Sequence, residues 1–351
     1  MTEFAIIGAG AVAQSRYIPA LETHPRTTVA WVVDVDEERA RRVAQTVGAA
    51  HETAYETVLG HVDAAIISTP PRFHESIARD CIQEGVHVLS EKPIAMSSEQ
   101  AVALTEMSQV SDIEFAICRQ YREAPASRLL KAFVQSGHLG SIQRVRGRFG
   151  DETQWQFESD YRIQEHLAGG GVLADKGPHL IDLVRWILGE DLRVDQYRDD
   201  SFGGLEANAE INFSVPGTSA SGAMEVSASR NITNVIEIAG DHGRILAELG
   251  GMQATMDTES LEEETVLTTA DDDPPRDSRE RMTRQVHRFV DSLETGSKSY
   301  VPAHTDIPIQ QIIEACYSQR EPLVTPWERK HFELAERSAD VPFVVPEGET
   351  R

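Results

Sequence analysis

The sequence predicts an α/β protein, with a doubly wound parallel sheet in the first half of the chain and an open, mainly antiparallel sheet in the second. Three observations predict this fold. A short apolar run ends in a glycine-rich turn and leads into a helical pattern within residues 4–21. Continuously apolar strands then alternate with helices up to residue 118, which is typical of a parallel sheet covered on both faces. From residue 208, apolar residues recur with period two between turn residues, as in antiparallel strands.

The elements of the first half are predicted from short apolar runs and from apolar residues at helical spacing. The predicted strands are Phe4–Ile7, Val29–Val33, Asp63–Ile67, Val86–Leu89 and Ile113–Cys118, and the predicted helices are Glu37–Val47, Phe73–Glu84, Ser97–Met107 and Ser127–Gln135. A further helical pattern follows the glycine turn and continues through Leu21. In such parallel sheets, ligands bind beyond the carboxyl ends of the strands, so we expect the site there.

The second half is predicted to form a sheet with one face packed on helices and the other on a partner subunit. Its predicted strands are Ile142–Phe149, Asn208–Val215, Ser219–Ser229, Asn234–Ala239 and Arg244–Glu248, and its predicted helices run from Pro178 to a stop at Gly189, from Arg281 to Leu293 and from Pro308 to Ser318. The acidic stretch Leu261–Asp277 lacks periodicity and is predicted to be a surface loop. We therefore divide the chain into residues 1–120, residues 121–325 and a C-terminal extension, residues 326–351.

The composition limits the partners of the chain. Its 351 residues are 40% hydrophobic and carry a formal net charge of -24, which argues against nucleic acid or an anionic membrane as a partner. No apolar run is long enough to span a membrane and the N-terminus does not resemble a signal segment, so a soluble, cytoplasmic protein is expected. The three scattered cysteines are expected to be reduced and buried. Only five of the 33 basic residues are lysines, which is typical of a high-salt cytoplasm; an ordinary acidic surface is the alternative.

The turn after the first predicted strand reads Gly8-Ala9-Gly10-Ala11-Val12-Ala13 and has the spacing G-x-G-x-x-A. The first glycine allows the tight turn, and the second lets a pyrophosphate approach the start of a helix. The second strand ends at Asp34, where a carboxylate accepts hydrogen bonds from ribose hydroxyls and repels a 2'-phosphate. These residues predict a dinucleotide site that favours NAD over NADP. The alternative is that Asp34 only caps the next helix, although Asp36 could do so instead.

Two other predicted strands end in residues that can take part in chemistry. Ser68-Thr69-Pro70-Pro71 follows one of them, with His74 just after, and Ser90-Glu91-Lys92-Pro93 follows the next. Lys92 stands out because lysine is scarce in this chain, and we interpret it as a site residue. A solvated lysine or a structural ion pair is the alternative. The Lys92-Pro93 peptide bond is a candidate for the cis form.

The densest run of unusual residues is Gly169-Gly170-Gly171-Val172-Leu173-Ala174-Asp175-Lys176-Gly177-Pro178-His179-Leu180-Ile181-Asp182. Its glycines allow a close approach of the backbone, and Asp175 and His179 are four positions apart, which in a helix puts both on one face. A carboxylate beside an imidazole can transfer protons near neutral pH. Because Pro178 disfavours helix before it, the regular helix is expected to begin there, with Asp175 in the turn leading in. The alternative is an ordinary helix start that Asp175 caps.

Together, these motifs resemble the glucose-fructose oxidoreductase / inositol dehydrogenase / MocA-like (Gfo/Idh/MocA) oxidoreductase family, over residues 2 to about 320. The resemblance is carried by Gly8-Ala9-Gly10, Thr69-Pro70 with His74, Glu91-Lys92-Pro93, the glycine-rich run, Gly137-His138-Leu139-Gly140-Ser141-Ile142 and Ala315 to Ser318. The Glu-Lys-Pro motif combined with D-x-x-x-H is the specific part. The dinucleotide turn alone is common to many proteins.

The resemblance implies an N-terminal Rossmann domain and a C-terminal α/β domain whose open sheet forms the interface of a homodimer or homotetramer. It also implies that Lys92, Asp175 and His179 surround the nicotinamide ring of NAD, with NADP the less expected cofactor. The residues assigned to the cofactor are Gly8, Gly10, Ala11, Val12, Asp34, Ser68, Thr69, Pro70, His74, Glu91 and Lys92. The family commonly has asparagine after its Thr-Pro, where this chain has Pro71, so any cofactor contact from that side chain is lost.

The predicted activity is the reversible oxidation of a secondary hydroxyl of a sugar, cyclitol or nucleotide-sugar, with hydride transfer to nicotinamide. In this hypothesis His179 takes the hydroxyl proton, Lys92 stabilises the developing alkoxide, and Asp175 orients the substrate or the imidazole. Two other functions are kept as alternatives: an NAD-dependent glycosidase that oxidises its sugar transiently, and a non-catalytic sensor of NAD or sugar. No metal is predicted, because His166, Asp175 and His179 have the donor types for a metal site but lack a tight ligand spacing.

The substrate pocket is predicted from the residues that precede the glycine run. Trp155, Phe157, Tyr161, Arg162 and His166 could line it, with aromatic faces against C–H groups and polar tips against hydroxyls. The alternative is that they are ordinary core and loop residues. The expected substrate is a small polyhydroxylated molecule.

Overall fold

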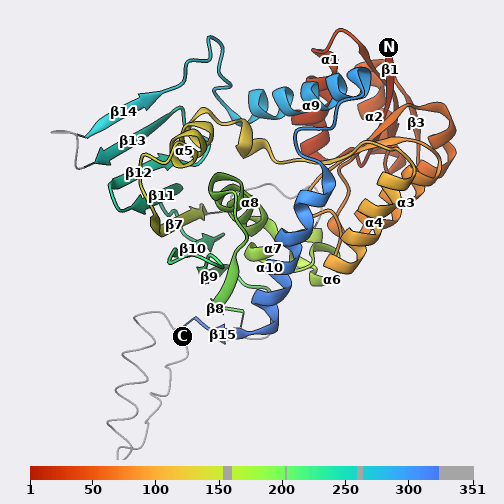
Figure 1. The fold of residues 1–351 in the computed structure, drawn as a ribbon. Helices are drawn as coiled ribbons and strands as arrows, with labels where there is room; N and C mark the ends of the chain where they lie inside the picture. Colours follow the sequence, from red (N-terminus) through yellow and green to blue (C-terminus); the bar gives the residue numbers. More distant parts are fainter. Residues whose placement is uncertain (153–159, 202–203, 259–263, 324–351) are drawn as a thin grey trace, which may run out of the picture.

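The computed structural model describes residues 1–152, 160–201, 204–258 and 264–323, and its elements are arranged around two sheets (Figure 1). The first sheet has six parallel strands in the order β3-β2-β1-β4-β5-β6, the order of a doubly wound nucleotide-binding sheet. Its strands are β1 (Thr2–Ile7), β2 (Thr27–Val33), β3 (Ala50–Glu52), β4 (Ala64–Ile67), β5 (His87–Ser90) and β6 (Phe115–Ile117). The structure therefore confirms the predicted parallel sheet.

Helices bury both faces of this sheet. One face packs against the π-helical turn η1 (Ala13–Tyr17) and the helices α1 (Ile18–Glu22), α2 (Glu37–Val47) and α9 (Ser278–Thr295), and the other against α3 (His74–Gln83) and α4 (Ser98–Val110). Helix α9 comes from the far end of the chain, and its Met282, Val286 and Phe289 share a core with Phe4 and Ile6. A division at residue 120 thus assigns the two sheets to different parts of the chain, but α9, which follows that division, packs on the first sheet.

The second sheet has nine strands in the order β14-β13-β12-β11-β7-β10-β9-β8-β15. Only the β7·β10 and β8·β15 pairs are parallel within the described residues, so the predicted mainly antiparallel sheet is confirmed. Its strands are β7 (Ile142–Gly150), β8 (Arg193–Asp199), β9 (Asn208–Ser214), β10 (Ser221–Ser227), β11 (Val235–Gly240), β12 (Gly243–Glu248), β13 (Gln253–Thr258), β14 (Thr265–Thr268) and β15 (Arg320–Pro322). The helices α5 (Pro125–Gln135), α8 (Gly177–Leu188) and α10 (Ile307–Ser318) share a core with it.

Buried and exposed side chains alternate along β7 and so distinguish the two faces of this sheet. Val145 and Phe149 are buried against the helices, in the same core as Leu180 of α8. Arg144 and Arg146 alternate with them and are exposed on the opposite face. The predicted packing of one face on helices is therefore confirmed, and the other face is charged.

Several predicted elements differ from the structure. The stretch predicted as an acidic loop contains β14, which pairs with β13 at the edge of the sheet. Asp175 does not lie in a turn, because it ends a separate short helix, α7 (Val172–Asp175). Helix α8 begins two residues later, at Gly177. Pro178 fits in its first turn, because a backbone N–H is not needed there. The strands β3, β8, β13 and β15 were not predicted.

Short helical segments complete the described chain. They are η2 (Tyr55–Thr57), η3 (Leu59–His61), η4 (Pro71–Phe73), η5 (Gln120–Glu123), η6 (Tyr161–Ile163), α6 (Glu165–Ala168) and η7 (Ala303–Asp306). The three cysteines are buried and free, as predicted. Among the described residues, no helix has the length and apolar character that crossing a membrane requires. The predicted extension, residues 326–351, lies outside the described residues.

Candidate active site

A cleft of about 460 Å³ opens at the carboxyl ends of β1, β2 and β4, at the edge where the site was predicted. The residues assigned to the cofactor that line it are Gly8, Gly10, Ala11, Val12, Asp34, Ser68, Thr69 and Pro70. Gly8 has a φ of +95°, and a Cβ there would lie 2.7 Å from the backbone oxygen of Ser68. A Cβ on Gly10 would face open space, with no atom within 4 Å. The turn therefore has the tight bend and the free backbone surface that a dinucleotide needs.

Asp34 is held by three donors in this cleft. Its Oδ2 accepts a hydrogen bond from the Ala9 N–H at 2.9 Å, and its Oδ1 accepts one from the Asp36 N–H at 2.9 Å. Arg39 Nη1 also donates to Asp34 Oδ1, at 3.2 Å, and both side chains line the cleft. Helix α2 is capped by Asp36, so the alternative in which Asp34 is the cap is wrong. Sequence analysis did not single out Arg39.

A second cavity, of about 300 Å³, adjoins the cleft and lies between the two sheets. Its polar lining residues are Ser68, Thr69, Glu91, Lys92, Tyr161, Arg162, Asp175 and Glu206, and among its apolar ones are Val12, Pro71, Pro93, Ile163, Val172 and Leu205. The cleft and the cavity share Val12, Ser68, Thr69, Tyr161 and Arg162. A molecule in the cavity can therefore contact a dinucleotide in the cleft.

Lys92 and Asp175 meet in this cavity, although they come from different halves of the chain. Lys92 follows β5, and its bond to Pro93 is cis. Its Nζ donates to Asp175 Oδ1 at 2.9 Å and also to the Asp175 carbonyl oxygen. The preceding Glu91 carboxylate accepts a hydrogen bond from the Tyr17 hydroxyl at 2.7 Å and one from the Lys92 N–H at 3.2 Å. Asp175 thus holds the Lys92 ammonium, and Glu91 holds the Lys92 backbone.

The Asp175 carboxyl is kept ionised by its neighbours. Burial alone would raise its pKa, but the positive charges of Lys92 and Arg162 outweigh burial and hold the pKa below its usual range. In the described part of the chain, no hydrogen bond joins Asp175 to the His179 ring. In this structure the Asp175 carboxylate therefore contacts the lysine, whereas the sequence hypothesis had it orient the substrate or the imidazole.

The His179 imidazole lies in the first turn of α8, edge to face with Tyr121 at 5.2 Å between ring centroids. Burial and the positive charges of Lys92 and Arg119 lower the pKa of His179 well below its usual value. The negative charge of Asp175 opposes this shift only in part. The ring is therefore neutral near pH 7 and able to accept a proton.

His74 is the one predicted cofactor residue that lines neither the cleft nor the cavity, whereas Glu91 and Lys92 line the cavity and the others line the cleft. It is 1% exposed, and its ring lies between two carbonyl oxygens, 2.7 Å from that of Pro93 and 2.8 Å from that of Thr69. It thereby ties the turn after β4 to the turn after β5. His74 cannot contact a cofactor because its side chain is buried and both of its ring nitrogens contact backbone carbonyl oxygens.

Glu206 was missed by sequence analysis. Its Oε1 accepts hydrogen bonds from the N–H groups of Gly171 and Leu173, each at 3.0 Å, and from the Tyr317 hydroxyl at 2.7 Å. Its Oε2 pairs with Arg320 at 3.5 Å, and burial raises the pKa of the carboxyl. Glu206 thereby fixes the glycine run and the helix α7. No pattern in the sequence marks it, since it lies in a loop and its partners are far along the chain.

The predicted substrate residues divide into three groups. Tyr161 and Arg162 line both the cleft and the cavity. His166 is exposed on α6 and lines neither. Trp155 and Phe157 lie outside the described residues.

No metal centre is found in the described part of the chain. Among those residues, no group of three or more histidine, cysteine, aspartate or glutamate side chains could hold a metal ion. His166, Asp175 and His179, the candidate ligands, do not form such a group.

Two family descriptions match the chain. Residues 2–113 match an oxidoreductase family with an NAD-binding Rossmann fold, and residues 127–246 match the GFO/IDH/MocA C-terminal domain. The two matches fall on the two sheets and meet at the cavity between them.

Relatives of known name agree with these matches. A levoglucosan dehydrogenase from Pseudarthrobacter phenanthrenivorans is 28% identical over 45% of this chain, although the match spans only 42% of that protein. A D-xylose 1-dehydrogenase (NADP(+)) from Haloferax volcanii is 26% identical over 91% of this chain and 97% of its own length. A solved 3-ketoreductase from Actinomadura kijaniata, in complex with NADP and TDP-benzene, has the same fold, with a TM-score of 0.80, 20% identity, and coverage of 93% of this chain and 99% of its own.

Proposed function

The chain belongs to the Gfo/Idh/MocA family of oxidoreductases, and from that premise we propose that it is a dehydrogenase that reversibly oxidises a secondary hydroxyl of a sugar, cyclitol or nucleotide-sugar. One observation carries the proposal. Lys92 and Asp175 form an ion pair, with the neutral His179 nearby, where the substrate-sized cavity adjoins the dinucleotide cleft. An alcohol in the cavity would have the Lys92 cation and a hydride acceptor within reach. His179 does not itself line the cavity, but Lys92 and Asp175, which do, both shift its pKa, and we propose that it acts as the base.

The proposed chemistry divides between the protein and its cofactor. A bound nicotinamide supplies the hydride acceptor. The His179 imidazole takes the hydroxyl proton, and the Lys92 ammonium donates a hydrogen bond to the oxygen as negative charge develops on it. The Asp175 carboxylate holds that ammonium in place. In the direction of reduction, the imidazolium returns the proton to the same oxygen.

We propose NAD as the preferred cofactor and Arg39 as the residue that limits this preference. The Asp34 carboxylate faces the cleft and would repel a 2'-phosphate. Arg39 neutralises part of this charge from 3.2 Å and could itself pair with a phosphate. The site should therefore accept NADP with reduced efficiency.

We propose a polyhydroxylated substrate and an assembly through the open sheet. Positively charged, negatively charged and hydroxyl side chains all line the cavity, so it can both donate hydrogen bonds to substrate hydroxyl groups and accept hydrogen bonds from them. The face of the second sheet that carries Arg144 and Arg146 would pack on a second copy, as a homodimer or homotetramer. Light scattering of the purified protein tests the assembly, and a monomeric mass would contradict it.

The acidic surface leads us to propose a high-salt cytoplasm as the working environment. A haloarchaeal relative aligns over 91% of the chain, and the net charge of -24 would cause less self-repulsion in molar salt. Unfolding measured in low and in molar KCl tests this. A free energy of unfolding that does not rise with salt would contradict it.

Reduction of NAD and NADP with a panel of free sugars, cyclitols and nucleotide-sugars tests the proposed activity. We expect reduced nicotinamide with one class of substrate, and none with His179→Ala. Cleavage of a glycoside without net reduction would favour the glycosidase alternative. Binding of NAD without any turnover would favour the sensor.

A further inference from the structure

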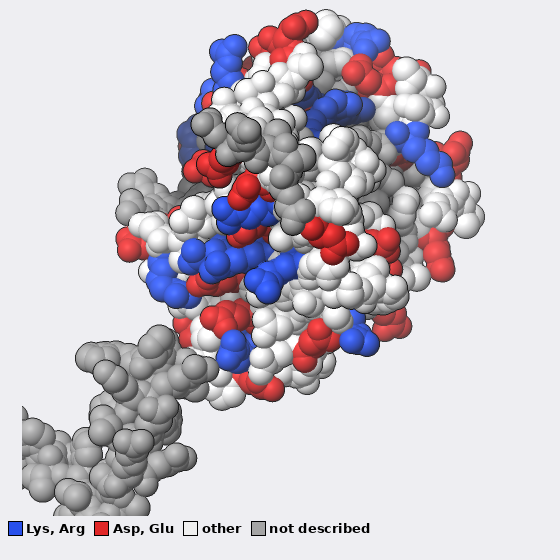
Figure 2. Space-filling model, turned by 60° about the vertical axis from the view of Figure 1, so that its left-hand side comes forward, with Lys and Arg blue, Asp and Glu red and all other residues white. Residues whose placement is uncertain are grey.

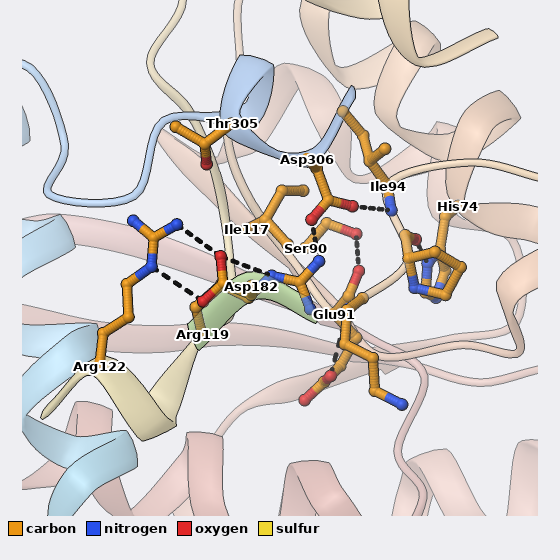
Figure 3. Close-up of polar contacts among 12 residues, drawn as sticks. His74, Ser90, Glu91, Ile94, Ile117, Arg119, Arg122, Asp182, Thr305 and Asp306 are labelled. Carbon is orange, nitrogen blue, oxygen red and sulfur yellow. Dashed lines mark hydrogen bonds and ion pairs between the residues drawn. The ribbon is translucent and has the colours of Figure 1, made fainter. Parts of the chain in front are cut away.

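A buried ion network lies behind the site and joins the two halves of the molecule (Figure 3). Arg122 Nε donates to Asp182 Oδ2 at 2.9 Å, and the other oxygen of Asp182 lies 3.9 Å from Arg119 Nε. Arg119 Nη2 also donates to Asp306. Asp306 in turn accepts a hydrogen bond from the Ile94 N–H at 3.0 Å. The side chains of Arg119, Asp182 and Asp306 are only 1–2% exposed.

The two ends of this network are next to the proposed catalytic residues. Ile94 is two residues after Lys92, in the turn that follows β5. Asp182 is one helical turn after His179 on α8. Arg119 is the residue that connects the two carboxylates, and it therefore connects the Lys92 turn to the His179 helix.

Arg119 is held in place, yet not all of its donors are used. Its backbone N–H donates to Gln285 Oε1 at 2.9 Å, and Gln285 Nε2 donates to the Ile117 carbonyl oxygen at 2.9 Å. Among the described residues, its Nε and Nη1 have no hydrogen-bond partner. Burial lowers the pKa of the guanidinium to about 10, so it stays charged. A buried cation with unused donors is costly, and such a group needs an explanation beyond stability.

We propose that Arg119 is a positioning residue, which fixes the Lys92 turn against the His179 helix and keeps a permanent positive charge near the imidazole. The proposal rests on the function proposed above for Lys92 and His179. The charge matters because a base must be neutral to accept a proton, and a nearby cation disfavours the imidazolium.

The groups that face the imidazole come from four elements. They are Lys92 after β5, Asp175 at the end of α7, Arg119 just after β6 and Tyr121 in η5, while Asp182 of its own helix is occupied by the two arginines. Lys92 and Arg119 lower the pKa of His179, and Asp175 raises it. Of the two cations, Lys92 lines the cavity and Arg119 does not.

Arg122 offers a matched control for Arg119. Both are buried arginines that pair with Asp182. Arg122 does not pair with Asp306, and it is not among the charges that shift the pKa of His179. A role limited to pairing with Asp182 would give Arg119 and Arg122 the same phenotype.

The first test is a histidine NMR titration of the resting protein, with the His179 signal assigned by its absence in His179→Gln. We expect Arg119→Gln to move the His179 titration to higher pH, Arg119→Lys to keep it near that of the wild type, and Arg122→Gln to leave it unchanged. Equal titrations in Arg119→Gln and Arg122→Gln would overturn the electrostatic part. Because the titration needs no substrate, it tests the role of Arg119 even if the proposed activity is wrong.

The second test is the pH profile of alcohol oxidation. We expect Arg119→Gln to lower kcat by about tenfold to a hundredfold, with its acidic limb at higher pH and KM within a few-fold. Arg119→Lys should restore most of kcat, and Arg122→Gln should keep the wild-type profile. If Arg119→Gln does not fold, Asp306→Asn, whose single acceptor oxygen cannot serve both the Ile94 N–H and Arg119, should lower kcat about tenfold. An unchanged kcat in Asp306→Asn would overturn the positioning part.

Discussion

Two of the ion pairs that join distant segments of this molecule differ sharply in burial. Arg26 pairs with Asp291 of α9 at 2.8 Å, and both side chains are more than half exposed, at 53% and 55%. Arg119 pairs with Asp306 behind the site, and both are 1–2% exposed. Breaking a buried pair costs about 3–5 kcal/mol, whereas an exposed pair contributes about 0.2–1 kcal/mol. The buried pair is therefore the stronger constraint on the geometry around it.

One face of the molecule (Figure 2) carries many charged side chains like those of the exposed pair. Figure 2 shows Lys and Arg side chains lying beside Asp and Glu over one face of the molecule. Such pairs are screened by salt and readily exchanged. The comparison therefore predicts that single changes at the site have large effects and that similar changes on the surface have small ones.

The largest expected effect is that of Lys92→Ala. Removal of the ammonium should lower kcat by about 10²–10⁴-fold, because both charge stabilisation and the position of the alcohol are lost. Steady-state rates of nicotinamide reduction measure this, and cofactor binding should persist. Lys298→Ala, at an exposed lysine, is the control and should keep wild-type rates. A Lys92→Ala rate within a few-fold of wild type would refute the assignment.

The next effect is on stability, at Glu206. Glu206→Ala leaves two backbone N–H groups and the Tyr317 hydroxyl without their acceptor, so the free energy of unfolding should fall by about 3 kcal/mol. Glu206→Gln keeps one acceptor oxygen and should lose less. Denaturant unfolding measures both variants. An equal loss in the two would show that the acceptor is not what matters.

A smaller effect is expected on the choice of cofactor. Asp34→Asn should raise the ratio of kcat/KM for NADP to that for NAD by about tenfold, or roughly 1.4 kcal/mol, because the repulsion of the 2'-phosphate is removed. Arg39→Ala should lower the same ratio, since the compensating cation is lost. Ratios that move in the same direction in both variants would contradict this assignment.

The smallest effect is expected at the exposed pair. Arg26→Gln should change the free energy of unfolding by no more than about 1 kcal/mol, with still less effect in high salt. Its kcat should equal that of the wild type. A loss as large as that of Arg119→Gln would remove the distinction between the two pairs.

Much of the first sheet could be predicted because its strands are continuously apolar and its helices have clear periodicity. The strands that were missed lack this signal. Arg193–Asp199 (β8), for example, consists mostly of charged and polar residues, and Ala50–Glu52 (β3) has only three residues. Thr265–Thr268 (β14) lies at the edge of its sheet, where pairing with one neighbour defines it. Such strands are specified by their partners more than by their own residues.

The site could be predicted only in part, for a related reason. Lys92, Asp175 and His179 were predicted because they stand in local motifs. Arg39, Glu206 and the Arg119 network were not, since their roles depend on contacts between distant parts of the chain. Arg119 and Asp306, for example, are 187 positions apart. His74 was assigned to the cofactor because its motif marked it, and only burial reveals that it supports the turns from behind.

Deuterium transfer tests the central claim most directly. A substrate found in the panel would be deuterated at the carbon that is oxidised, and the reduced cofactor would then be analysed. The account predicts that wild-type protein transfers the deuterium to C4 of the nicotinamide, and that Lys92→Ala and His179→Ala do so far more slowly. Reduced nicotinamide without deuterium, or product without net reduction, would contradict it.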